Sequence, residues 1–352
     1  MGKRTRGFAI VAAVVSLLLV AAACGGDDSG GNTTGASGAT ATGAGDLTGT
    51  ITISGSSTVQ PISSLVAELF NEDVAPNVSI SVDGPGTGDG FVLFCKGETD
   101  ISDASRQIEP EEADACKSAG IDYVELEVGI DGITVMTNPA NDAVTCLNMG
   151  DLYSLFGPES TGIDTWSGAN DLAAEVGGTG GFPDAPLDIT APGEESGTYD
   201  TFIELTGIED TALERGVPED EAAGLRKDYQ PSPDDNVIIQ AMESTDTPLG
   251  FVGFAYAEEA GDQIKEIQVD GGDGCVDPSA ETIADGSYPL SRSLYIYVRT
   301  NALTDNPAVQ AFVDYYVGDN GLVTAVPEAG YIQLPQERID ATRSAWQTAS
   351  GS

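Results

Sequence analysis

The hydrophobic pattern of the chain predicts three units in which a strand, a polar loop and a helix follow one another. In the first unit, Ile51 and Ile53 alternate with polar residues, as in a half-buried strand, and apolar residues then recur at helical spacing from Ile62 to Phe70. Pro61 stands in the expected first turn of this helix, where proline is best tolerated. The same order recurs as strand 78–82 before an apolar run from Phe91, and as strand 187–189 before a helical stripe from Tyr199.

Hydroxyl groups and glycines gather in the loops of all three units. The loops are SGSSTV at 54–59, GPGTGDG at 84–90 and GEESGT at 193–198. Each loop precedes an expected helix start, where backbone N–H groups lack partners and the helix dipole presents partial positive charge. Serine and threonine at such positions can act simply as N-caps, but the first and third loops hold more hydroxyls than one cap needs. We therefore predict that the loops converge on a site for an oxyanion.

A fourth segment, GETDISDASRQIEP at 97–110, supplies a cation beside this site. It reads as a short strand, then Ser105 and Arg106, then an acidic helix start. Because basic residues are scarce in this chain, Arg106 is a candidate anion ligand. A surface ion pair with the nearby acidic residues is the alternative interpretation.

The N-terminus carries the features of an exported protein. Residues 1–23 have a basic start, an apolar run and small residues before Cys24, as in a secretory signal peptide. The sequence AAAC also resembles a lipobox, with Ala21 in place of the usual leucine, so we expect a lipid on Cys24 rather than ordinary cleavage. The polar segment 24–46 cannot bury a core and is predicted to be a flexible tether.

Composition excludes several classes of function. Three of the 14 basic residues precede Cys24, which leaves 11 against 57 acidic residues in the mature part, a balance that repels nucleic acid. The chain has no histidine and no G-x-S-x-G motif, so a Ser-His-Asp triad is excluded. An enzyme would need a serine–lysine pair or carboxylate chemistry, and we expect no enzyme and no cofactor. About 305 residues after the tether suit two lobes rather than one core.

Four cysteines remain besides Cys24, an even number that favours two disulfides in an exported chain. Of the three possible pairings, the nearest-neighbour one is the most economical, with Cys95 bound to Cys116 and Cys146 to Cys275. No CxxC spacing occurs, so we expect no metal site.

Several segments, taken in order, resemble the phosphate-binding proteins of bacterial phosphate-specific ABC transporters. They are SGSSTV, GTGDGF, TDISDASRQI and GEESGTYDTF, followed by DLYSLFGPESTGIDTW, PLGFVGFAYAEEAGDQIKEIQVD and DGSYPLSRSLYIYV. The resemblance runs from about Thr50 to Tyr331 and is strongest to the subgroup typified by the cyanobacterial SphX proteins.

The resemblance implies an α/β, two-lobed type II periplasmic-binding-protein fold with two crossover strands and a ligand cleft between the lobes. Lobe 1 would comprise residues 47–130 plus 285–352, and lobe 2 residues 131–284. The protein would act as a monomer, held by its lipid at the outer face of the cell membrane, and would capture inorganic phosphate for the permease subunits of an ABC transporter. The alternatives are binding of sulfate or molybdate, an exported phosphatase, or a surface protein that only binds other proteins.

The resemblance also implies which residues contact phosphate. They are Ser57, Thr58 and the Val59 amide in the first loop, Thr87 in the second, Ser196, Gly197 and Thr198 in the third, and Ser105 with Arg106 in the fourth segment. Some relatives have an aspartate at the position of Ser105, which accepts the proton of hydrogen phosphate. Since this chain lacks it, the candidate acceptors are Asp103, Glu195 and Asp200.

Overall fold

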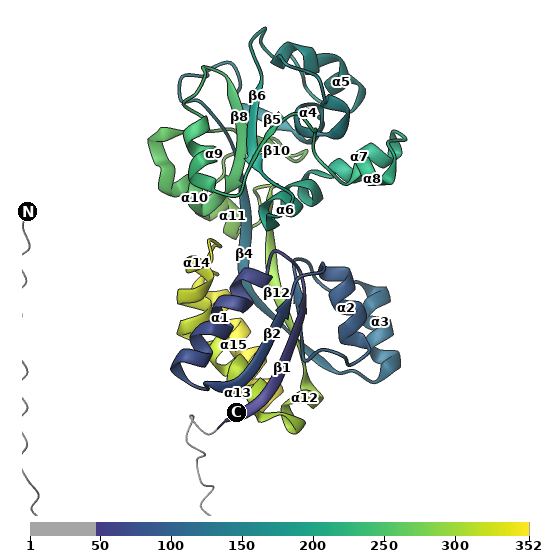
Figure 1. Ribbon diagram of the computed structural model, residues 1–352, viewed down its shortest axis with the longest axis vertical. Helices are drawn as coiled ribbons and strands as arrows, with labels where there is room; N and C mark the ends of the chain where they lie inside the picture. The colour runs from purple at the N-terminus through teal and green to yellow at the C-terminus, as the bar shows by residue number, and fades with distance from the viewer. Residues whose placement is uncertain (1–46, 352) are drawn as a thin grey trace, which may run out of the picture. The chain divides into compact units, whose positions relative to one another are not determined.

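The computed structural model describes residues 47–351, whose main feature is a nine-stranded sheet (Figure 1). Its strands are β1 (Thr48–Gly55), β2 (Asn77–Asp83), β3 (Ile101–Ala104), β4 (Tyr123–Thr137), β6 (Asp188–Pro192), β7 (Gln230–Ser232), β8 (Pro248–Gly253), β9 (Lys265–Glu266) and β12 (Ser291–Arg299). They lie in the order β2-β1-β3-β12-β4-β8-β6-β7, with β9 paired to β4. Strand β1 is parallel to both of its neighbours, whereas β12 is antiparallel to β3 and β4.

Strand β4 belongs to both halves of this sheet. Residues 123–132 pair with β12, and residues 133–136 pair with β8. The chain returns along β4, where the Ile133 amide donates to the Leu290 carbonyl just before β12 begins. The fold is therefore a two-lobed α/β fold with two crossover strands, as expected. The lobe boundaries at 130/131 and 284/285 remain a proposal, and β4 changes its partner between Gly132 and Ile133.

Helices cover both halves of the sheet. Those of the N- and C-terminal segments are α1 (Gln60–Asp73), α2 (Thr87–Cys95), α3 (Pro110–Ala119), α12 (Thr300–Asp305), α13 (Pro307–Tyr316), α14 (Val326–Glu328) and α15 (Gln336–Ser350). Between the crossovers lie α4 (Met149–Phe156), α5 (Asn170–Glu175), α6 (Gly197–Thr206), α7 (Ile208–Glu214), α8 (Glu219–Ala222), α9 (Asp235–Ala241), α10 (Phe254–Ala260) and α11 (Ala280–Ala284). A small sheet of β5 (Cys146–Asn148), β10 (Gln268–Asp270) and β11 (Cys275–Val276) completes the second half.

The three predicted strand–loop–helix units are β1–α1, β2–α2 and β6–α6. Ile51 and Ile53 are fully buried in β1, and Pro61 lies in the first turn of α1, as the pattern predicts. One boundary differs, because α2 begins at Thr87 rather than at the apolar run from Phe91. A Cβ on Gly90 would lie 2.4 Å from the Gly55 Cα, so this glycine permits close helix packing rather than a loop.

Two disulfides reinforce the fold. Cys95 is bonded to Cys116, which ties α2 to α3, and Cys146 is bonded to Cys275, which ties β5 to β11. This is the nearest-neighbour pairing expected from the sequence. The predicted signal peptide, Cys24 and the tether lie outside the described residues.

Among residues 47–351, no helix is both long enough and apolar enough to cross a bilayer.

Candidate anion-binding site

A cavity of about 310 Å³ lies where the loops after β1 and β3 face helix α6. Its lining comprises Ser56, Ser57, Thr58, Gly86, Thr87, Gly88, Ser105, Arg106, Asp200, Glu204 and Arg292. It thus brings together residues of five separate parts of the sequence, among them much of the predicted phosphate site and one candidate proton acceptor.

The loop after β1 is shaped by its close approach to β3. A Cβ on Gly55 would lie 2.0 Å from the Asp103 carbonyl oxygen, so only glycine fits there. The next amide, of Ser56, donates to that same carbonyl at 2.8 Å. The loop is therefore fixed to the sheet and holds Ser57 and Thr58 at the cavity.

The hydroxyls of Ser57 and Thr58 in this loop both contact helix α6. The Ser57 hydroxyl donates to Asp200 at 2.9 Å, and the Thr58 hydroxyl lies 3.1 Å from that of Thr201. Gly197 comes equally close, since a Cβ there would lie 3.3 Å from the Thr58 Cα. The first loop of one lobe thus meets the first turns of a helix of the other.

The second loop and the fourth segment meet through a pair of hydroxyls. Thr87 is the first residue of α2, and its Oγ1 lies 3.0 Å from the Ser105 Oγ and accepts from the Ser105 amide at 3.2 Å. The two side chains can exchange this mutual hydrogen bond for bonds to an anion, because each hydroxyl is both donor and acceptor.

Arg106 lies at the cavity and also forms the ion pair that was its alternative interpretation. It lines the cavity, and its guanidinium also forms two hydrogen bonds of 2.9 Å with the Glu112 carboxylate. This pairing raises the pKa of Arg106 above its ordinary value, and the guanidinium lies 5.7 Å from the Phe91 ring centre. Arg106 is thus a fixed cation whose charge is largely offset by a carboxylate of the following helix, α3.

The predicted residues of the third loop lie beside the cavity rather than in its lining. The Ser196 hydroxyl caps α6 and accepts from the Thr198 amide at 3.2 Å, which is the ordinary N-cap role. Gly197 and Thr198 are half-buried. Val59 is fully buried next to Thr58 at the start of α1.

The three candidate proton acceptors are separated by the fold. Asp200 lines the cavity, where loss of hydration raises the pKa of its carboxyl against the lowering effect of the Ser57 hydroxyl. Asp103 is fully buried on the other side of the loop, and burial raises its pKa to about 7. Its Oδ1 accepts from Ser63 at 2.9 Å. Glu195 is exposed and lines a different hollow, of about 400 Å³.

Arg292, on β12, was missed by the sequence reasoning. Its Nη2 donates to the hydroxyls of Thr58 at 3.1 Å and Thr201 at 2.7 Å, and its Nη1 pairs with Glu204. A signal was available, because Arg292 is the single charged residue in the crossover segment SYPLSRSLYIYV. That segment was interpreted only as part of the fold.

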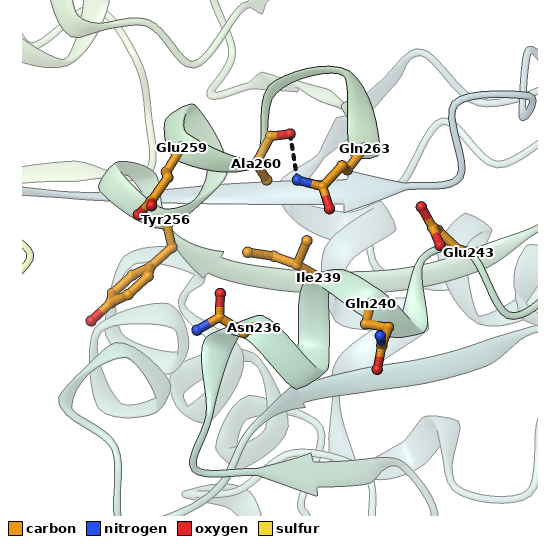
Figure 2. A pocket seen from close by; sticks show the side chains of 8 residues that line it. All are labelled: Asn236, Ile239, Gln240, Glu243, Tyr256, Glu259, Ala260 and Gln263. Carbon is orange, nitrogen blue, oxygen red and sulfur yellow. Dashed lines mark hydrogen bonds between the residues drawn. The ribbon is translucent and has the colours of Figure 1, made fainter.

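A second hollow, of about 320 Å³, is less suited to an anion (Figure 2). It lies between α9 and α10, and its lining includes Glu243 and Glu259 but no lysine or arginine among the described residues. Figure 2 shows Gln263 donating back to the Ala260 carbonyl of its own turn. Two carboxylates without a cation repel an anion, so the cavity beside α6 is the stronger candidate.

Residues 47–351 contain no group of histidine, cysteine, aspartate or glutamate side chains that could hold a metal ion.

Comparisons with known proteins agree with the fold. Residues 37–320 match the family described as a PBP superfamily domain. Protein SphX of Synechocystis sp. is 40% identical over 291 residues, which cover 82% of this chain and 79% of SphX. Phosphate-binding protein PstS of Staphylococcus haemolyticus is 33% identical over 294 residues, 83% of each chain. The crystal structure of a possible phosphate binding protein from Planctomyces limnophilus shares 35% identity with a TM-score of 0.76, and covers 86% of this chain and 99% of that one.

Proposed function

The chain belongs to the PBP superfamily and to the family of the SphX and PstS proteins, and from this membership we propose that it captures inorganic phosphate between its two lobes. It then delivers the phosphate to the permease of an ABC transporter. As a member of this family it is a solute-binding protein rather than an enzyme. The observation that carries the proposal is the cavity in which hydroxyls of the first lobe face helix α6 of the second.

The proposed contacts are mostly neutral donors. The hydroxyls of Ser57, Thr58, Thr87 and Ser105 line the cavity, and the helices α1, α2 and α6 begin beside it. Helix N-termini bind anions because their N–H groups are free and the dipole favours negative charge.

The remaining predicted ligands depend on movement of the lobes. The Val59 amide and the third-loop residues lie just outside the cavity lining, at the starts of α1 and α6. We propose that they contact phosphate when the lobes close, because hinge closure around a ligand is a recognised motion of two-lobed binding proteins. The third-loop residues are Ser196, Gly197 and Thr198.

Replacing Thr87 with alanine should weaken phosphate binding about 10- to 150-fold, the effect of losing one hydrogen bond to a charged ligand. Titration calorimetry with phosphate measures the change in affinity, and titrations with sulfate and arsenate show whether other anions are affected. Thr324→Ala, at an exposed position outside the cavity, is the matched control. Equal phosphate affinity of Thr87→Ala and the wild type would mean that the hydroxyl pairs only with Ser105.

Capture outside the cell requires export and retention at the membrane. We propose that residues 1–23 are the signal peptide, that Cys24 carries the lipid, and that residues 24–46 tether a monomeric binding domain to the outer face of the cell membrane.

The variant Cys24→Ala should leave a folded, phosphate-binding protein in the soluble exported fraction, because the anchor and the binding domain are separate parts of the chain. Fractionation of cells followed by calorimetry on the released protein measures both properties. Retention of the variant on membranes would refute the lipid anchor without affecting the phosphate site.

A further inference from the structure

Arg292 joins both lobes at the cavity through three side chains. Thr58 lies in the loop after β1, whereas Thr201 and Glu204 lie on α6. The Arg292 side chain is only 9% exposed, and its register partner on β4 is Asp131. The guanidinium therefore stands at the crossover between the lobes and forms part of the cavity wall.

Glu204 differs from the other partners of Arg292. Its side chain is 53% exposed, and it pairs with the Nη1 edge of Arg292 from within the cavity lining. The other guanidinium nitrogen, Nη2, already donates to the Thr201 hydroxyl. That hydroxyl in turn donates to Asp131 at 2.9 Å. Glu204 can therefore move into solvent while the rest of the Arg292 contacts persist.

A phosphate oxygen and a carboxylate oxygen make the same kind of bond to a guanidinium. In the cavity, the Glu204 carboxylate occupies the Arg292 edge that an entering phosphate would meet. Arg106, the other cation of the lining, is already bound by two hydrogen bonds to Glu112, whose side chain is only 18% exposed. Of the two arginines, Arg292 thus has the more readily displaced partner.

We propose that Arg292 is a phosphate ligand and that Glu204 is its internal competitor, a carboxylate that phosphate displaces from the guanidinium when it binds. This inference rests on the proposed phosphate-binding function and deepens it. The competition lowers affinity and links binding to α6, because displacement frees Glu204 from the crossover strand. If the Arg292–Glu204 ion pair merely held the lobes together, removing Glu204 would weaken phosphate binding instead of tightening it.

The test is a double-mutant cycle measured by phosphate calorimetry. Glu204→Gln should bind phosphate about 3- to 10-fold more tightly than the wild type, since a partly exposed ion pair and one like charge are removed. Arg292→Gln should bind about 10- to 150-fold more weakly, and Arg292→Lys should lie between it and the wild type. In the Arg292→Gln background, Glu204→Gln should no longer tighten binding, because Glu204 acts through Arg292.

Controls separate this inference from the proposed function and from general charge effects. Glu214→Gln, at an exposed position at the end of α7, removes one negative charge from the same lobe and should leave affinity unchanged. Absence of phosphate binding by the wild type would refute the proposed function itself. If the wild type binds phosphate, two results overturn the competitor role. One is a phosphate affinity of Glu204→Gln that is equal to or weaker than that of the wild type. The other is an equal gain in affinity from Glu204→Gln with arginine and with glutamine at position 292. If Arg292→Gln fails to fold, the single variant Glu204→Gln decides: tighter phosphate binding supports the competitor role, and unchanged or weaker binding overturns it.

Discussion

Replacing Asp200 with asparagine should allow sulfate to compete with phosphate. Near neutral pH phosphate carries a proton that a fixed carboxylate can accept, whereas sulfate offers only an oxygen of like charge. Sites built on such a pairing reject the mismatched ligand by on the order of 10⁴-fold, and we expect the amide to remove most of this preference. Asp200 is the candidate acceptor that lines the cavity, where it already accepts from Ser57.

The two other candidate acceptors are the controls. Glu195→Gln changes an exposed carboxylate in a different hollow and should keep full selectivity. Asp103→Asn changes a buried carboxyl whose contact is Ser63, so it should also retain selectivity. Competition calorimetry with both anions measures the ratio of affinities. Loss of selectivity in Asp103→Asn but not in Asp200→Asn would transfer the role to the buried acid.

Removal of the Cys146–Cys275 disulfide should cost about 5 kcal/mol of unfolding free energy, against about 3 kcal/mol for Cys95–Cys116. The difference follows from the sequence separations of 129 and 21 residues, because a longer loop restrains the unfolded chain more. Denaturant unfolding of the two double alanine variants measures both values.

Removal of the short disulfide, Cys95–Cys116, should weaken phosphate binding more than removal of the long one, Cys146–Cys275. This order is the reverse of the order expected for stability. The short disulfide ties α2, which begins at Thr87, to α3, which carries the Arg106 partner Glu112. The long one ties two strands of the small sheet, and neither of its cysteines lines the cavity. A smaller loss of stability from the long disulfide than from the short one would contradict the loop-entropy argument.

The main elements could be predicted from the sequence because their patterns are local. Alternation at Ile51 and Ile53 and the helical stripe from Ile62 are both consequences of burying one face. The start of α2 could not be predicted from such a pattern. Gly90 is helical because its missing side chain lets α2 pack against Gly55, a contact between distant parts of the chain.

The candidate site was predicted in part for the same reason. Thr87 was predicted from a glycine-rich loop before a helix and Ser105 from the family resemblance, and the fold places their hydroxyls 3.0 Å apart. Arg292 was missed because its role depends on the strand register that sets it opposite Asp131 and within hydrogen-bond distance of Thr58. As the single charge in its segment Arg292 is unusual, but that local signal does not reveal which loops the arginine will meet.

A crystal structure of the protein with phosphate tests the central claim most directly. We predict one phosphate in the cavity beside α6, within hydrogen-bond distance of Thr87 and Ser105 from the first lobe and of α6 N-terminal groups from the second. Glu204 should then be turned away from Arg292. Phosphate bound only in the hollow between α9 and α10, or to one lobe alone, would contradict capture between the lobes.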